Sequence, residues 1–475
     1  MSIGATLRSI SRASGSRRCY ARCGRSASAD RRTVRLALAI AVLATVAFAV
    51  TFCAHPPAGA RPNVVLVTID TERADHTSTY GYPHPTTPHL DALAADGAVF
   101  TAAYTAIPTT GPSHAGLFTA QYPAEHGVLR NGDVLGATPP TLTELLARAG
   151  YVTAAFVSAY PLAQKFGYAR GFATYDDEFT AADASIVLPE WEGERVESAG
   201  FDRRADATTE RALRWLAGAP RDHPVFLWVH YYDPHEPYDP PPAYRDGIDD
   251  ARSPLERAVA AYDAEIRFAD DQLGRLIDAV DRRLGAGDTL VVIATDHGEG
   301  LMQHGWMGHG ANLYEELVRT VLVFRRPGHL RAQRSATPVG LIDVAPTVLA
   351  HVGLDAGALH PRGVDLAGAP PADRPLFFQR RVYQPGSRDD VPVRGAMHGV
   401  RIGSWKYVDA SSTGPELFDL ASDPGETRNL RERETARADE LAAVLGKWRV
   451  AQGGAVEAPL SPDEARRLRA LGYVE

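Results

Sequence analysis

The fold of this chain is decided by the stretch NVVLVTID, residues 63–70. A continuous apolar run of this kind is typical of a strand that is buried on both faces of a parallel sheet. The strand ends at Asp70, and open α/β sheets bind their ligands at the carboxyl ends of their strands. Residues 63–70 therefore predict both an α/β core and the edge of the sheet at which its site lies.

Further strands and helices alternate along the chain. We expect strands at 151–157, 225–229 and 289–294, and helices at 88–97, 112–120, 141–150 and 258–284. This alternation predicts a mostly parallel sheet between helices, in a catalytic domain that spans 63–370. From residue 371 the expected strands are shorter, and a last helix covers 432–448. That pattern predicts a smaller C-terminal subdomain, residues 371–475, with an antiparallel sheet.

The N-terminal segment differs in charge from the rest of the chain. Residues 1–35 hold nine arginines and one acid, a net +8, so with a total of −8 the remainder carries −16. Residues 36–54 hold no charged side chain, and the run is long enough to span a bilayer. These features predict a basic cytoplasmic tail, then a transmembrane anchor or a signal segment, then a linker at 55–62. The acidic remainder argues against a nucleic-acid partner.

This topology predicts a catalytic domain outside the cytoplasm, either periplasmic or extracellular. The domain is anchored to the membrane if residues 36–54 are retained, and it is secreted if they are cleaved. The three cysteines, Cys19, Cys23 and Cys53, all precede residue 60. The folded part therefore has no disulfide, no thiolate metal ligand and no cysteine nucleophile.

Side chains that could bind a metal or take part in catalysis recur at strand ends. Asp70 follows the first strand, the segment Thr109–His114 (TTGPSH) precedes a helix, and Asp296-His297 follows the strand at 289–294. Two carboxylates, a hydroxyl and an imidazole suit a divalent cation. Taken alone, an Asp after a strand is more often a helix N-cap, and Asp-His-Gly is commonly a turn. The combination of all three features favours a metal site.

Five segments carry a resemblance to a known family. They are PNVVLVTIDTERADHTSTYGY (62–82), GPSHAGLFTAQYPAEHGV (111–128), FLWVHYYDPHEPYDPP (226–241), TLVVIATDHGEGLMQHGWMGHG (289–310) and ELFDLASDPGETRNL (416–430). In this order they resemble the sulfatase branch of the alkaline-phosphatase superfamily, from residue 61 to the end of the chain. The resemblance implies the alkaline-phosphatase-like α/β fold with a C-terminal subdomain.

The resemblance also implies a metal held by Asp70, Thr110, Asp296 and His297. The metal would be a divalent cation such as Ca, Mg, Mn or Zn, and a second metal is possible because histidines lie nearby in the motifs. Thr110 occupies the family's nucleophile position. In sulfatases that residue is a cysteine or serine that is converted to formylglycine, so Thr110 indicates a variant whose nucleophile is a threonine hydroxyl.

Four more residues receive roles from the resemblance. His114 stands where sulfatases have an arginine, and His309 where they have a lysine that grips the anion. His235 matches a histidine that contacts the transferring group or protonates the leaving oxygen, and a loop histidine is the alternative. Asn131 falls where related diesterases place an amide donor, with a turn role as the alternative. Glu299 we interpret as structural.

Together these features predict a hydrolase of sulfate or of phosphate and phosphonate esters, acting through a metal-bound Thr110 outside the cytoplasm. The substrate would be a small-molecule, glycan or lipid ester. One alternative is an envelope transferase of phosphoethanolamine or phosphoglycerol. A second alternative is a catalytically silent, sulfatase-like binding protein, since the formylglycine motif is lost.

Overall fold

The structure is a computed structural model that describes residues 61–180, 201–380, 395–410 and 413–449. The predicted tail at 1–35, the hydrophobic segment at 36–54 and most of the linker at 55–62 lie outside these residues, so they stay predictions. Within the described ranges, no helix combines the length and apolar character needed to cross a membrane.

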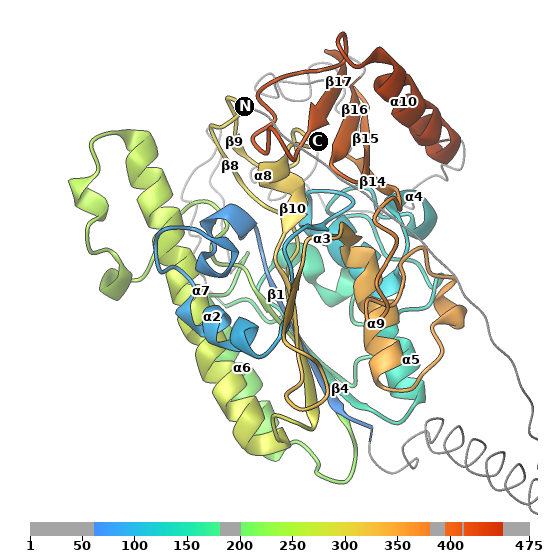
Figure 1. Ribbon diagram of the computed structural model, residues 1–475. Helices are drawn as coiled ribbons and strands as arrows, with labels where there is room; N and C mark the ends of the chain where they lie inside the picture. Colours follow the sequence, from blue (N-terminus) through green and yellow to red (C-terminus); the bar gives the residue numbers. More distant parts are fainter. Residues whose placement is uncertain (1–60, 181–200, 381–394, 411–412, 450–475) are drawn as a thin grey trace, which may run out of the picture. The chain divides into compact units, whose positions relative to one another are not determined.

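An eight-stranded sheet forms the centre of the region that begins at residue 60 (Figure 1). Its strands, in spatial order, are β12 (Gln333–Ser335), β2 (Ala98–Phe100), β11 (Leu322–Arg325), β7 (Thr289–Thr295), β1 (Asn63–Ile69), β6 (Val225–Tyr231), β4 (Val152–Phe156) and β5 (Thr174–Asp176). The pairs formed by β7, β1, β6, β4 and β5 are all parallel, and β11 runs antiparallel to both of its neighbours. The predicted mostly parallel sheet is therefore confirmed.

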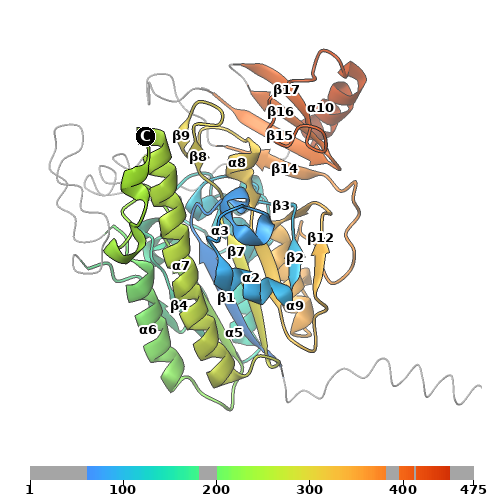
Figure 2. The same cartoon turned by 60° about the vertical axis from the view of Figure 1, so that its left-hand side comes forward.

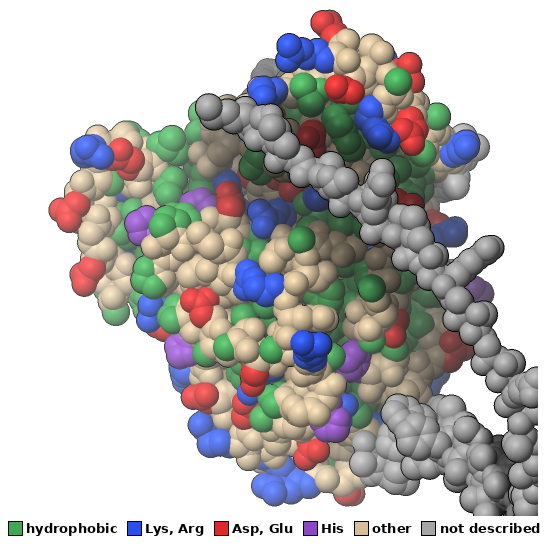
Figure 3. Space-filling view, viewed as in Figure 1, with side chains coloured by type: hydrophobic (Ala, Val, Ile, Leu, Met, Phe, Trp, Pro, Cys, Tyr) green, Lys and Arg blue, Asp and Glu red, His purple; other side chains and the backbone are tan. Residues whose placement is uncertain are grey.

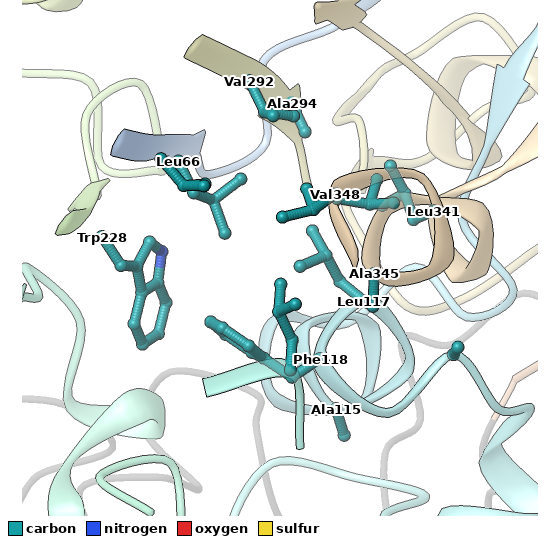
Figure 4. Close-up of a cluster of buried hydrophobic side chains, with 14 of the residues drawn as sticks. Leu66, Ala115, Leu117, Phe118, Trp228, Val292, Ala294, Leu341, Ala345 and Val348 are labelled. Atoms are coloured by element: carbon teal, nitrogen blue, oxygen red, sulfur yellow. The ribbon is translucent and has the colours of Figure 1, made fainter. Parts of the chain in front are cut away.

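Helices cover both faces of this sheet (Figure 2). One hydrophobic cluster joins Val65, Val67 and Ile69 of β1 to α2 (Pro88–Ala95), α6 (Ala205–Gly218) and α7 (Pro254–Leu284). The alternate residues Val64 and Leu66 join a second cluster with α3 (Thr110–Thr119), α5 (Leu142–Arg148) and α9 (Val344–His351) (Figure 4). Because successive side chains of a strand point to opposite faces, the apolar run of β1 supplies both clusters at once.

The C-terminal subdomain has the predicted antiparallel sheet. Its strands, in spatial order, are β14 (Leu376–Gln379), β15 (Met397–Ile402), β16 (Trp405–Ala410) and β17 (Gly414–Asp419). Helix α10 (Thr435–Arg449) packs on it through Ala438, Leu441 and Leu445. This helix matches the one expected at 432–448, and the boundary predicted at residue 371 stays a prediction.

Shorter strands and α-helices lie between these elements. They are β3 (Ala103–Tyr104), α4 (Pro123–His126), β8 (Gly300–Leu301), β9 (Met307–Gly308), α8 (Glu315–Val318), β10 (Arg319–Thr320) and β13 (Val339–Gly340). On the face that Figure 3 presents, acidic and basic side chains are interspersed.

A buried ionic cluster joins the C-terminal sheet to helix α8. Lys406 in β16 is fully buried, with its Nζ 2.9 Å from Glu426 Oε1 and 3.1 Å from Glu315 Oε1. The Tyr104 hydroxyl donates to the other oxygen of Glu315 at 2.8 Å. These two carboxylates raise the pKa of Lys406 although burial opposes them, so the ammonium stays charged.

Candidate active site

Three neighbouring strands bring acidic and imidazole side chains to one edge of the sheet. Asp70 follows β1, Asp296 and His297 follow β7, and His230 is the penultimate residue of β6. His297 Nε2 lies 3.6 Å from Asp70 Oδ1 and 3.6 Å from Asp296 Oδ2. All of these side chains are buried. The three predicted ligands from strand ends are therefore next to one another.

Thr110 is the first residue of α3, two residues before the predicted start of that helix. The N-cap is Thr109, so the Thr110 side chain is not used as a cap. Its hydroxyl is fully buried and has no hydrogen-bond partner among the described residues. The hydroxyl lies close enough to Asp70 to lower the pKa of that carboxyl, although the larger effect of burial raises it. Thr110 thus faces the same edge as the acids.

The backbone around Thr110 is held by other side chains. The Gly111 N–H donates to Asn131 Oδ1 at 2.7 Å, and the Ser113 hydroxyl donates to the backbone oxygen of Asp296 at 2.7 Å. A Cβ on Gly111 would stand 2.9 Å from the hydroxyl oxygen of Tyr168, so only glycine fits here without a shift. These bonds tie the start of α3 to the strand that carries Asp296.

His114 is hydrogen-bonded through both ring nitrogens. Its Nδ1 is 2.8 Å from the Thr110 carbonyl oxygen, and its Nε2 is 3.0 Å from the Thr68 hydroxyl. The Trp228 indole N–H also donates to the Thr68 oxygen, at 2.9 Å, which leaves the Thr68 proton for His114 Nε2. His114 Nδ1–H therefore donates to the Thr110 carbonyl, and in this arrangement the ring supports the backbone of the nucleophile.

Asn131 presents an amide to the site. Because its oxygen accepts from Gly111, its NH₂ group points elsewhere, and this nitrogen is buried without a hydrogen-bond partner in the described region. The Tyr168 hydroxyl, which the sequence analysis missed, is also buried without a hydrogen-bond partner there. Two donors thus lie beside the residue that follows Thr110.

His235 and His309 lie on the other side of His297. The ring centroid of His309 is 4.6 Å from that of His297 and 4.9 Å from that of His235. His235 Nδ1 is 2.6 Å from the Glu236 carbonyl oxygen, and His309 Nδ1 is 3.2 Å from Glu299 Oε1. The structure therefore brings every residue predicted for the site to one edge, while their catalytic and ligand roles stay predictions.

Burial sets the charge states at this edge. It raises the pKa of Asp70 to about 7, and burial together with the Asp70 charge raises that of Asp296. Burial lowers the pKa of His230 to about 4 and that of His235 to about 3. Burial therefore keeps the imidazoles neutral, which is the state that binds metals, and it disfavours the carboxylate charges, which a bound cation would stabilise.

Whether a cation fits this site can be judged from the buried polar atoms that lack hydrogen-bond partners. Both Asp70 oxygens, Asp296 Oδ2 and His297 Nε2 are buried without hydrogen-bond partners among the described residues. Buried polar atoms normally have partners, because leaving them unpaired costs free energy. Ligand atoms 3.6 Å apart match the spacing around an ion with bonds of roughly 2.0–2.2 Å. The residues therefore fit a divalent cation.

The sequence analysis did not identify His230. The residue lies in the strand VFLWVHY, inside the quoted segment 226–241, but only His235 of that segment was given a role. The register of the sheet could have revealed it, because His230 pairs with Thr68, two residues before Asp70. His230 and His114 form a second acid–imidazole group with Asp296.

A parallel sheet with a hydroxyl, two acids and imidazoles at its carboxyl edge is the arrangement of alkaline-phosphatase-like ester hydrolases. Within that class, the chain belongs to the sulfatase family, because residues 62–354 match the family model described as Sulfatase. The chain is accordingly a hydrolase that acts on sulfuric or phosphoric ester bonds.

Similar proteins agree with this assignment. The chain is 27% identical over 423 residues to the uncharacterized sulfatase YidJ of Escherichia coli K12, covering 78% of this chain and 83% of that protein. It is 25% identical over 480 residues to the choline-sulfatase of Rhizobium meliloti strain 1021, covering 86% and 90%. The phosphonate monoester hydrolase of Agrobacterium radiobacter has the same fold, with a TM-score of 0.67, 22% identity and coverage of 82% and 96%.

Proposed function

We propose that this chain hydrolyses phosphoric or phosphonic esters, with Thr110 as the nucleophile. The observation that carries the proposal is the Thr110 hydroxyl, buried without a hydrogen-bond partner among the described residues and directed to the edge that holds Asp70. No cysteine follows Cys53, so the cysteine route to formylglycine is closed. A threonine ester has no second hydroxyl on the same carbon, so water must release it by attack on the transferred group. That route suits phosphorus better than sulfur.

The reaction has two half-reactions. Thr110 Oγ1 attacks the phosphorus atom, the bond to the leaving oxygen breaks, and the leaving oxygen takes up a proton. Water then attacks phosphorus, the bond to Thr110 Oγ1 breaks, and this oxygen regains its proton. The covalent Thr110 ester divides one difficult displacement into two easier ones.

His235 is the group to which we assign the proton transfers. Its Nδ1–H donates to the Glu236 carbonyl oxygen, so Nε2 is the atom that exchanges the proton. Burial lowers the pKa of His235 to about 3, which makes the ring a transient carrier and not a stored acid. Nε2 accepts a proton in one step and returns it in another, and such catalysis contributes roughly 10²–10⁴-fold.

Hydrogen-bond donors and a bound cation would stabilise the negative charge on the oxygens of the ester. Asn131 Nδ2 and His309 are assigned to the non-bridging oxygens, where preorganised donors favour the transition state. A divalent cation at Asp70, Asp296, His297 and Thr110 would supply Lewis acidity, which lowers the pKa of a hydroxyl and offsets negative charge.

The location outside the cytoplasm is a separate part of the proposal. It is supported by the uncharged segment 36–54 behind nine arginines. Fractionation of cells that express the full chain, beside a chain that lacks residues 1–60, tests it. Full-length protein in the cytosolic fraction would contradict the proposed location.

The reaction is tested by comparing four substrates. The full chain is purified without chelator, and turnover is measured on an aryl phosphate monoester, an aryl phosphodiester, an aryl phosphonate and an aryl sulfate. We expect phosphorus esters to be cleaved, with activity lost in Thr110→Ala and retained in part in Thr110→Ser. Cleavage of the sulfate alone would contradict the preference for phosphorus. Unchanged turnover in Thr110→Ala would exclude Thr110 as the nucleophile.

A further inference from the structure

His230 is a buried polar side chain that the proposed reaction does not use. It is fully buried in β6, and neither ring nitrogen has a hydrogen-bond partner within the described ranges. Its ring packs at 5.1 Å from that of His114 and at 6.4 Å from that of Trp228. An imidazole that is buried in this way costs free energy unless something pairs with its lone pair.

The carboxylate of Asp70 lies between two imidazoles. Its Oδ1 is 3.6 Å from His297 Nε2, and its Oδ2 is 3.6 Å from His230 Nε2. A ring nitrogen of His230 also lies within 4.8 Å of an Asp296 oxygen. These atoms are too far apart for hydrogen bonds with one another, and the spacing is that of ligands around an ion. The candidate ligand atoms form two groups that share Asp296, one with Asp70 and His297 and one with His114 and His230. The 3.6 Å between His230 Nε2 and Asp70 Oδ2 brings His230 next to the first group.

We propose that His230 is a further ligand of the ion held by Asp70, Asp296 and His297. Two imidazoles beside two carboxylates favour a transition metal such as zinc or cobalt over calcium or magnesium, which prefer oxygen ligands. The inference rests on the proposed function in so far as this ion serves the same site. It adds the ligand set and the class of metal.

His114 is not part of this ligand set, although it lies beside His230. Both of its nitrogens are hydrogen-bonded, one to the Thr110 carbonyl and one to Thr68. Binding an ion through Nδ1 would break the hydrogen bond that supports the nucleophile. His230 has no competing hydrogen bond in the described structure, which makes it the better ligand.

Metal binding tests the proposal without any measurement of turnover. The full chain is stripped with a chelator and reloaded with Zn²⁺, Mn²⁺, Co²⁺, Ca²⁺ or Mg²⁺. Stoichiometry is measured by elemental analysis, and Kd by competition with a chromophoric chelator. We expect one ion per chain, with Zn²⁺ and Co²⁺ bound more tightly than Ca²⁺. In His230→Gln, the affinity for Zn²⁺ should fall by at least about 10–100-fold, the loss that supporting residues of metal sites already cause.

The matched control is His126→Gln. His126 is also buried, and burial likewise lowers its pKa to about 3, but it lies in α4, outside the acid–imidazole groups of the described residues. We expect this variant to bind metal as the wild type does. Circular dichroism and thermal melting show whether each variant is folded.

A measurement on the wild type keeps the proposal testable if His230→Gln does not fold. Pulsed electron paramagnetic resonance of the Mn²⁺-loaded protein counts the coordinated imidazole nitrogens, and we expect two. One coupled nitrogen, an unchanged Kd in folded His230→Gln, or tighter binding of Ca²⁺ than of Zn²⁺ would overturn the proposal. Two ions per chain, of which His230→Gln loses one, would overturn the single-ion arrangement.

These outcomes are distinguishable from failure of the proposed reaction. If Thr110 is not the nucleophile, Thr110→Ala keeps its turnover, and the metal data are unaffected. If His230 is not a ligand, the metal data contradict it, while the Thr110 variants still report on the nucleophile.

Discussion

Two buried ionic clusters in this protein are built from the same kinds of groups and differ in one respect. Beneath the C-terminal sheet, Glu426 and Glu315 face the ammonium of Lys406 at 2.9 and 3.1 Å. At the edge of the main sheet, the ion-pair partners of Asp70 and Asp296 within the described region are imidazoles, and the backbone N–H groups of Thr71 and His297 donate to Asp296 Oδ1. The first cluster contains its own cation, and the second does not.

This difference separates a structural cluster from a site. Taking carboxylates out of water is costly, and a buried lysine offsets the cost permanently. The second cluster leaves both Asp70 oxygens and Asp296 Oδ2 without hydrogen-bond partners among the described residues, so this part of the cost is offset only when a ligand binds. Buried acids without a protein cation are therefore the better indication of function. The following experiments address this comparison.

The largest expected effect is that of Thr110→Ala on turnover. Removing a nucleophile should lower kcat by about 10⁴-fold or more. The melting temperature should stay close to that of the wild type, because the Thr110 hydroxyl has no hydrogen bond to lose in the described structure. A steady-state assay beside a melting curve measures both, and a large fall in melting temperature would mean that Thr110 is structural.

The second effect is on stability and concerns the other cluster. Lys406→Met removes the only ammonium in contact with Glu426 among the described residues and leaves Arg401, 3.9 Å from Glu315, as the nearby cation. The variant should cost about 3–5 kcal/mol of unfolding free energy. The control is Lys447→Met, because Lys447 is an exposed side chain of α10. Denaturant unfolding of both variants measures the difference. Equal stability of the two would contradict a structural role for the Lys406 cluster.

The third effect is that of metal removal. A chelator should abolish turnover and lower the melting temperature, and a transition metal should restore both. At about 100-fold excess over Kd, the bound ion contributes about 2.7 kcal/mol of stability. Lys406→Met should respond to the chelator as the wild type does, since its cluster holds no ion. A melting temperature that is insensitive to chelator would remove the basis for a metal site.

The smallest expected effect is a change in unfolding free energy when a carboxylate is replaced by an amide, and its sign should differ between the two clusters. In metal-free protein near pH 8, Asp70→Asn should stabilise the fold by roughly 1–3 kcal/mol, because burial disfavours the Asp70 charge and raises its pKa to about 7. Glu426→Gln should instead destabilise it, since Lys406 then loses its nearest carboxylate. Denaturant unfolding after chelation measures both changes. The same sign for both would mean that the clusters are alike.

Much of the site was predictable because its residues follow apolar strands. Asp70 and Asp296-His297 stand where runs of buried residues stop, and parallel strands bring such ends together. His230 was not predictable in this way, because it lies one residue inside a strand and its significance depends on register with β1. The role of the His114 hydrogen bonds depends on Thr68 and Trp228, which are distant in sequence.

The Lys406 cluster was missed for a related reason. Its three residues come from β16, α8 and a loop, and the lysine in WKYV has no sequence feature that marks it as buried. The fold class was easier to predict, since the alternation of strand and helix patterns is a local property of the sequence.

The backbone around residue 110 has a consequence for how such enzymes diversify. Gly111, the Thr110 carbonyl and Ser113 are fixed by Asn131, His114 and the Asp296 backbone. The side chain at position 110 contributes nothing to this scaffold in the described structure. Cysteine, serine or threonine can therefore occupy the position without a rearrangement of the protein around it. A lineage with this architecture can exchange its reactive group by a single codon change, and with it the need for a maturation enzyme.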